Sequence, residues 1–281
     1  MDMCADAARQ QPGHTISMPA PSSPQPPADV RVSYASTDIF LERPALLARG
    51  RSALTPAERE RHDRFRHDID RHMFLLGRLM ARALVGRALG CDPRAWTWRD
   101  GPRGRPEVGG PATPVRFNLA HSAGLVACVV ACGRDVGVDV EDLDRRQPEP
   151  DIVGRYCAPD EVADIRAQGD DWSDRFLRYW TLKEAYLKAR GLGIAVPLAE
   201  ISFALDGESS ARIAFLGSLR GTDDAWSFVL ARPTGRHLLA VAASSPEGPH
   251  HPTVSIGTLD AGELCDVWLP SGTRAADAGT P

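Results

Sequence analysis

The sequence predicts an α+β protein made of two lobes of similar plan. Residues 29–134 and residues 135–245 each contain a strand pattern, then helical patterns, then further strand patterns. A turn near Gly133 to Asp135 joins the two halves. Because ligands usually sit where two domains meet, we expect a binding cleft between the lobes.

The first lobe begins with a strand followed by two helices. "VRVSYAS" is typical of a strand, and "LTPAERERHDRF" opens a helix with Thr55 as N-cap, Pro56 at the first helical position and Glu58 completing a capping box. The next helix ends near Gly90, and its apolar residues recur at helical spacing: Phe74, Leu75, Leu79, Met80, Ala83 and Leu84. Three short strands follow between Gly and Pro clusters, in "AWTWRD", "VRFNLAHS" and "LVACVVAC".

The second lobe repeats this order. "VGVDVED" is its first strand, helical patterns cover residues 152–156, 159–168 and 172–190, and "ISFAL", "ARIAFLG", "WSFVLAR" and "HLLAVAAS" supply the remaining strands. Outside the lobes, residues 1–28 are rich in Pro, Ser and Gln, which predicts a disordered leader. Residues 246–281 are turn-rich and predict a loosely ordered tail.

Composition excludes several classes of protein. No apolar run is long enough for a membrane span and no secretory signal is recognisable, so we expect a cytoplasmic protein without membrane contact. The six cysteines lack Cys-x-x-Cys spacing, which argues against a structural zinc site or a disulfide framework. Arginines outnumber acids between Arg43 and Arg105. Such a positive region suits nucleic acid, a phosphate-rich small molecule or an acidic protein, but few aromatics interleave the arginines, so we expect no nucleic-acid partner.

The strand "GVDVED" places two carboxylates on one face. Alternate side chains of a strand share a face, so Asp139 and Glu141 project together while Val138 and Val140 face the core. Paired carboxylates need a cation, a proton or a basic partner, and Mg²⁺ typically binds one or two carboxylates together with substrate phosphates. An ordinary exposed strand is the more common explanation of such a motif on its own.

The segment "YWTLKEAYLKARGLG" contains both lysines of the chain, among 33 basic residues that are otherwise arginine. On a helix, Trp180, Glu184 and Lys188 follow at i, i+4 steps, with Lys183 on the flank. A surface Glu–Lys pair would explain this spacing, but it gains little from lysine over arginine, whereas a compact ammonium suits a phosphate. Glu184 would complete a magnesium shell with Asp139 and Glu141.

Further residues point to phosphates. "GRGRPEV" places Arg103 and Arg105 in a glycine-punctuated turn, and "FNLAHS" ends a strand with Asn118 and His121. The long first-lobe helix adds three arginines near one face: Arg71, Arg78 and Arg82. On its own, an arginine in a turn or on a helix is more often solvated, and a single histidine after a strand is more often structural than a ligand.

Taken in order, "GRPEV", "FNLAHS", "GVDVED" and "WTLKEAYLKARGLG" resemble the signature motifs of the Sfp-type 4'-phosphopantetheinyl transferases, and "WTLKEA" is similar to their W/KEA branch. The resemblance covers about residues 54–203 and implies a pseudo-twofold monomer of two α+β lobes. It also implies a reaction in which coenzyme A donates its 4'-phosphopantetheine arm to a serine of an apo acyl or peptidyl carrier protein, releasing adenosine 3',5'-bisphosphate.

The resemblance assigns roles by motif position. It implies Asp139, Glu141 and Glu184 as Mg²⁺ ligands, with Glu184 as the catalytic base. Lys183 and Lys188 would hold the coenzyme A phosphates, and Lys188 counts among the catalytic residues. Arg105 and His121 would contact the 3'-phosphate end of coenzyme A, while Trp180 packs and orients the helix and the role of Glu161 stays open.

One position departs from the family pattern, because Met73 stands where many members carry an arginine before an aromatic residue. Arg71, His72 or Arg78 would then supply the phosphate contact. A coenzyme A or nucleotide-binding module without catalysis is the alternative, although simple anion binding gains nothing from three carboxylates. The carrier protein would belong to a polyketide synthase, a nonribosomal peptide synthetase or fatty acid synthesis.

Overall fold

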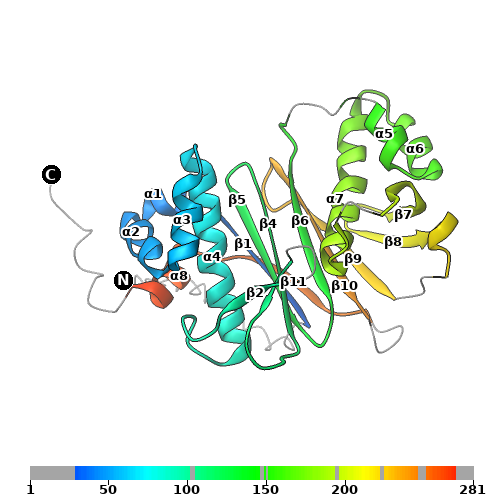
Figure 1. The fold of residues 1–281 in the computed structure, drawn as a ribbon. Coiled ribbons are helices and arrows are strands. Elements are labelled where there is room, and N and C mark those ends of the chain that lie inside the picture. The colour runs from blue at the N-terminus through cyan, green and yellow to red at the C-terminus, as the bar shows by residue number, and fades with distance from the viewer. Residues whose placement is uncertain are drawn as a thin grey trace, which may run out of the picture.

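The computed structural model describes residues 29–101, 105–145, 149, 151–193, 196–221, 225–245 and 251–269. Within these residues, two sheets pack against each other face to face, and a long helix covers the outer face of each (Figure 1). The predicted leader at residues 1–28 and the turn residue Arg103 lie outside the described residues.

The first lobe is built on a four-stranded sheet with the order β11-β1-β5-β4. Its strands are β1 (Val30–Ser36), β4 (Val115–Ser122), β5 (Leu125–Cys132) and β11 (Val254–Thr258). β1 pairs antiparallel with β5 and parallel with β11. β2 (Trp98–Asp100) and β3 (Pro106–Val108) form a separate antiparallel pair beside this sheet.

Helices cover the outer face of the first sheet. They are α1 (Ile39–Glu42), α2 (Pro44–Ala53), α3 (Pro56–Arg64), α4 (Asp68–Leu89) and α8 (Ala261–Trp268). The predicted capping box is present, because Thr55 Oγ1 accepts from the backbone of Glu58 and the Glu58 carboxylate accepts from the backbone of Thr55. α4 buries its apolar stripe against β4 and β5, and Gly90 ends it in the left-handed conformation at φ 66°.

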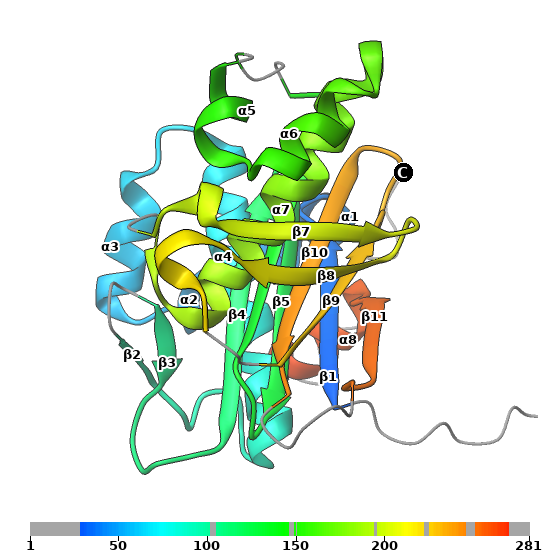
Figure 2. The ribbon, with the colours of Figure 1, turned by 90° about the vertical axis from the view of Figure 1, so that its right-hand side faces the viewer.

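The second lobe carries a five-stranded sheet with the order β6-β10-β9-β8-β7 (Figure 2). Its strands are β6 (Val136–Asp142), β7 (Ile201–Asp206), β8 (Ser210–Phe215), β9 (Trp226–Ala231) and β10 (His237–Ser244). Its helices are α5 (Asp151–Tyr156), α6 (Pro159–Arg166) and α7 (Trp172–Arg190). α7 packs on β6 and β10, so each lobe consists of a sheet with one long helix on its outer face.

Between the sheets lies a core of small and branched apolar side chains. Val32 and Val129 come from the first sheet, and Val138, Val140 and Val241 from the second. Asn118 on β4 adds a polar link, since its Oδ1 accepts from the backbone N–H of Val138 at 3.2 Å. The core and this hydrogen bond join β4 of the first lobe to β6 of the second.

The tail prediction was wrong for part of its length. Residues 254–258 form β11 on the edge of the first sheet, and 261–268 form α8, whose Leu264 and Trp268 are buried in the first-lobe core. The first lobe is therefore completed by chain that follows the second lobe. None of the described helices is long and apolar enough to cross a membrane.

Candidate active site

β6 carries the predicted pair of carboxylates. Val138 and Val140 face the core between the sheets, so Asp139 and Glu141 face the opposite side, where α7 lies. Asp139 is only 6% exposed. The alternation predicted from the sequence is confirmed, but α7 covers the carboxylate face, so β6 is not an ordinary exposed strand.

Gly137 sets the distance between β6 and α7. A Cβ at this position would lie 2.5 Å from the backbone nitrogen of Ala189 and closer still to the carbonyl oxygen of Ala185. No other residue type allows this approach without moving the helix. The close packing brings Glu184 and Lys188, on successive turns of α7, next to Asp139.

Lys188 forms the central ion pair of this cluster. Its Nζ donates to Asp139 Oδ1 at 2.6 Å, while Glu141 Oε2 accepts from Arg145 Nη1 at 2.6 Å. Two carboxylate oxygens, Asp139 Oδ2 and Glu184 Oε1, are buried without a hydrogen-bond partner in the described structure. The cluster is therefore rich in acceptors and short of donors.

The electrostatics of the cluster reflect this imbalance. Burial raises the pKa of Asp139, Glu141 and Glu184, and the charge of Asp139 raises the pKa of the other two further. Unpartnered, mutually repelling carboxylate oxygens are the donor set that a hard divalent cation takes, so these residues fit Mg²⁺. In the described chain, no three acidic, histidine or cysteine side chains already stand in positions that would enclose a metal ion.

Lys183 lies elsewhere, and the prediction that it contacts phosphate was wrong. Its side chain is 1% exposed, and its ammonium pairs with Glu161 Oε2 at 2.8 Å and donates to the carbonyl oxygens of Leu198 and Ile201. A helix turns by about 100° per residue, so Lys183 points away from the face of its neighbour Glu184. Lys183 is a buried structural cation that ties α7 to α6 and β7.

His121 lies near Lys188 at the end of β4. The residue as a whole is exposed, yet desolvation of its imidazole ring lowers the pKa of that ring. The positive charge of Lys188 lowers this pKa further. The positive charge of Arg61 on α3 acts in the same direction. The negative charge of Asp70 on α4 opposes this effect, so His121 lies in the field of both signs of charge.

Arg105 links the first lobe to the end of α7. Its Nη1 donates to the carbonyl oxygen of Ala189 at 2.6 Å, and its Nη2 donates to Glu107 Oε1 at 3.2 Å. The carbonyl groups at a helix C-terminus carry partial negative charge, so this contact is favourable. Arg105 is therefore close to the turn of α7 that carries Lys188.

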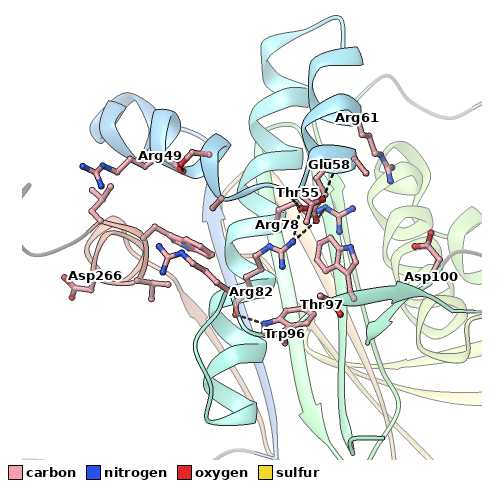
Figure 3. Close-up of a pocket in the computed structure, with 18 residues that line it drawn as sticks. Arg49, Thr55, Glu58, Arg61, Arg78, Arg82, Trp96, Thr97, Asp100 and Asp266 are labelled. Carbon is pink, nitrogen blue, oxygen red and sulfur yellow. Dashed lines mark hydrogen bonds and ion pairs between the residues drawn. The ribbon is translucent and has the colours of Figure 1, made fainter. Parts of the chain in front are cut away.

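The arginines of α4 face a different part of the molecule. Arg71 bonds to Asp68 and to the carbonyl oxygen of Phe65. Arg78 lies 3.4 Å over the ring of Trp98, and burial lowers its pKa to about 10. Arg78 and Arg82 both line a first-lobe cavity that the three carboxylates do not border (Figure 3).

Comparison with known proteins shows the family of this chain. The family model of the 4'-phosphopantetheinyl transferase superfamily matches residues 135–242. A phosphopantetheinyl transferase of Thraustochytrium sp. is 32% identical over 86% of this chain and 88% of its own length. The chain belongs to the 4'-phosphopantetheinyl transferase superfamily.

Two bacterial members of the superfamily are also similar in sequence to this chain. The 4'-phosphopantetheinyl transferase HetI of Nostoc sp. is 34% identical over 69% of this chain and 79% of its own, and a 4'-phosphopantetheinyl transferase of Bacillus subtilis is 31% identical over 61% and 78%. All three relatives are named as transferases. The alternative of a non-catalytic binding module receives no support from them.

The departure from the superfamily pattern at Met73 has a structural account. Met73 is buried, and its Sδ accepts from the backbone N–H of Gly124 in the turn between β4 and β5. The residue thus supports the turn that follows His121. Sequence reasoning also missed Arg61, although it stands three residues after Glu58 on the same helix and hence near the same face.

Proposed function

We propose that this protein transfers the 4'-phosphopantetheine arm of coenzyme A to a serine hydroxyl of an apo acyl or peptidyl carrier protein, releasing adenosine 3',5'-bisphosphate. The observation that carries the proposal is the cluster of Asp139, Glu141 and Glu184 beside Lys188, with two buried carboxylate oxygens that lack partners. Membership of the transferase superfamily supports the same chemistry.

Asp139, Glu141 and Glu184 would hold Mg²⁺. The ion, when bound, would neutralise charge on the pyrophosphate of coenzyme A. The fit rests on this chain's own donor set, since no other described group satisfies Asp139 Oδ2 or Glu184 Oε1. Simple anion binding has no use for three acidic groups at this position.

Glu184 is the proposed general base. In the reaction the serine oxygen forms a bond to the β-phosphorus of coenzyme A, and the bond from that phosphorus to the oxygen bridging to adenosine 3',5'-bisphosphate breaks. Glu184 takes the serine proton, directly or through a water molecule, and burial suits it because a raised pKa makes a carboxylate a better proton acceptor. Lys188 holds the phosphate oxygens of coenzyme A, because its ammonium offsets their negative charge.

His121, Arg61 and Arg105 are the proposed contacts of the 3'-phosphate end of coenzyme A. Their support is the positive charge of Lys188 and Arg61 that acts on His121, and the position of Arg105 at the last turn of α7. Arg71 and Arg78 remain proposed phosphate contacts, but their described contacts are all to first-lobe groups.

The proposed partners are carrier proteins of polyketide synthases or nonribosomal peptide synthetases, which would place the enzyme in secondary metabolite biosynthesis. We further propose that it acts as a cytoplasmic monomer, because the two lobes within one chain already supply both sides of the site. Arg61 and Arg105 come from the first lobe, and Glu184 and Lys188 from the second.

The test is transfer itself. Purified protein is incubated with coenzyme A, Mg²⁺ and a panel of apo carrier proteins, and intact mass reports the addition of one phosphopantetheine. We expect addition to at least one carrier and its loss with a chelator. No addition to any carrier, despite measured coenzyme A binding, would favour the binding-module alternative.

A matched pair of variants tests the base. Glu184→Gln keeps the size of the side chain and should slow transfer by about 10²–10⁴-fold, the usual contribution of a general base. Glu60→Gln changes an exposed carboxylate on α3 and should leave the rate unchanged. An unchanged rate in Glu184→Gln would remove this residue from both proposed roles.

A further inference from the structure

A pocket of about 280 Å³ lies beside the last turns of α4, on the outer face of the first sheet. Helix α4 contributes one wall and the strands β1 and β5 another, and we call this space the α4 pocket. Its main lining residues are Arg31, Leu84, Arg87, Ala88, Val130 and Cys132. The volume is close to the lower end of the range for pockets that bind small molecules.

The strand register brings the polar residues of the α4 pocket to one place. Arg31 on β1 pairs with Val130 on β5, and directly opposed residues of an antiparallel pair share a face. Cys132 stands two residues further along β5, so its side chain projects from the same face. On α4, Leu84 and Arg87 stand three residues apart and share one side of the helix. Two guanidinium groups and a thiol therefore surround one space.

The floor of the α4 pocket is apolar. Leu84 and Val130 belong to the first-lobe core and are 5% and 8% exposed, and Ala131 beside them is 5% exposed. Ala88 adds a methyl group at the exposed rim. A ligand with a short aliphatic body would remove apolar surface from water on both sides of this contact, which favours binding.

The rim carries unbalanced positive charge. Arg31 and Arg87 are both exposed, and within the described residues neither lies at ion-pair distance from a carboxylate. Asp29 is the acid that lines the pocket, and its Oδ2 already accepts from the backbone N–H of Thr253 at 2.9 Å. Two arginines against one aspartate leave a single positive charge, which matches a carboxylate better than a doubly charged phosphate.

We propose that the α4 pocket binds a small aliphatic monocarboxylate. The carboxylate pairs with Arg31 and Arg87 at the rim, because the guanidinium fork matches the two oxygens of a carboxylate. The aliphatic body lies on Leu84 and Val130, with Cys132 beside it. This assignment uses every class of side chain that lines the pocket.

The α4 pocket is remote from the carboxylate cluster. Cys132 ends β5, whereas the turn that follows His121 precedes the other end of this strand. The eight residues of β5 span roughly 24 Å at about 3.4 Å per residue. None of the residues proposed to hold Mg²⁺ or coenzyme A lines the pocket. The proposal therefore does not depend on phosphopantetheinyl transfer.

Cys132 provides a readout inside the α4 pocket. Alkylation by iodoacetamide is followed at each cysteine by peptide mass, with and without sodium hexanoate as the probe. We expect hexanoate to slow alkylation of Cys132 and to leave that of Cys91 unchanged, since Cys91 is exposed outside the pocket. Equal slowing at both cysteines, or at neither, would overturn the proposal.

Partial probes separate the two halves of the ligand. Acetate keeps the head group without the aliphatic body, and hexanol keeps the body without the charge. Each should protect Cys132 only at a concentration about tenfold higher than hexanoate, since each loses one of the two contacts. Hexylamine, which has the opposite charge, should give no protection. Equal protection by hexanol or acetate, or better protection by hexyl phosphate, would contradict the assignment.

Variants at the rim test the two charges. Arg31→Gln and Arg87→Gln should fold normally, because both side chains are exposed, and each should weaken the protection by hexanoate several-fold. Arg43→Gln is the control, since Arg43 is an exposed arginine of the same lobe that does not line the pocket. Thermal unfolding checks the fold of all three variants. Wild-type protection in both rim variants would remove the arginines from the site and overturn the proposal.

Filling the α4 pocket gives an independent test. Ala88→Leu places a larger side chain over the floor from an exposed position of α4, where leucine is also a good helix former. It should abolish protection by hexanoate while its unfolding temperature matches that of the wild type. Retained protection would show that hexanoate binds elsewhere.

Adenosine 3',5'-bisphosphate tests whether the α4 pocket is separate from the proposed active site. This nucleotide is the product of the proposed transfer and has no thiol that would react with iodoacetamide. It should leave alkylation of Cys132 unchanged, both alone and together with hexanoate. Protection of Cys132 by the nucleotide alone would place the pocket in the coenzyme A site and overturn the proposal of a second site.

Discussion

The two lobes contain the same local arrangement at the same point in their plan. In each, a helix begins with Pro at its first position and Glu at its third, as in Pro56 with Glu58 and Pro159 with Glu161. Each Glu accepts from a backbone N–H at the start of its helix, at 2.8 Å in the first lobe and 2.7 Å in the second. Each then pairs with a basic side chain of the following long helix, Arg82 on α4 or Lys183 on α7.

The surroundings of the two pairs differ. Glu161 and Lys183 are sealed in the second-lobe interior, and Glu161 also accepts from the backbone of Phe203. Glu58 lies in the wall of the first-lobe cavity, where Arg78 is a second basic neighbour. The same arrangement therefore supports α7 behind the carboxylate cluster in one lobe and borders a cavity in the other.

The largest expected difference concerns stability. Lys183→Met leaves Glu161 buried without its cation and should lower the free energy of unfolding by about 3–5 kcal/mol. Arg82→Met, the matching change in the first lobe, should destabilise less, because Arg78 remains beside Glu58. Urea unfolding of both variants measures this. An equal or larger loss in Arg82→Met would break the comparison.

The two lysines of α7 should then show opposite profiles. Lys188→Ala should lower the rate of carrier modification about 100-fold, which corresponds to roughly 2.7 kcal/mol of transition-state stabilisation. It should unfold at a midpoint closer to the wild type than Lys183→Met does, because Lys188 is 30% exposed and water replaces part of its contact. Wild-type turnover in Lys188→Ala would remove its proposed phosphate contact.

A smaller effect is expected at the contact between β6 and α7. Gly137→Ala forces the two elements apart and should destabilise the protein by about 1–3 kcal/mol, with a lower transfer rate since Glu184 and Lys188 move away from Asp139. Gly154→Ala on α5 is the control, because a Cβ there meets no atom within 4 Å. Thermal unfolding and transfer rate of both variants are compared, and a harmless Gly137→Ala would show that α7 does not depend on this close approach.

The sequence was sufficient for elements with clear local boundaries. Gly and Pro turns bracket β4, β5 and β6, and the capped pattern of α7 ends at Gly191, so their bounds follow from local rules. β11 and α8 were missed because Pro and His precede them and because β11 pairs with β1 from the far end of the chain. Pairing between distant segments leaves no local pattern to detect.

The site residues also divide into those that local spacing predicted and those that depend on contacts between distant segments. Strand alternation and i, i+4 spacing predicted the grouping of Asp139, Glu141, Glu184 and Lys188. Lys183 was misassigned because its partner, Glu161, belongs to another helix, and sequence spacing alone does not tell a buried lysine from an exposed one. The first-lobe cavity was not predicted either, since it depends on the docking of α8.

The smallest expected effect is a difference in pH dependence between the two pairs. Burial opposes ionisation of Glu58, but the backbone N–H of Thr55 and the charges of Arg82 and Arg78 outweigh it and lower its pKa below 4.5. Its ionised form therefore stabilises the fold above pH 4.5, and this contribution is lost as the pH falls through the lowered pKa. Burial dominates at Glu161 and raises its pKa, so its contribution is lost as the pH rises.

Glu58→Gln and Glu161→Gln measure this contrast directly. Between pH 3 and pH 7, the advantage of the wild type over Glu58→Gln in unfolding temperature should grow, because the wild-type carboxylate ionises while the amide does not. Its advantage over Glu161→Gln should shrink over the same range, since ionisation in the sealed interior is unfavourable. Slopes of the same sign would mean that the two pairs have equivalent surroundings, contrary to the burial that separates them.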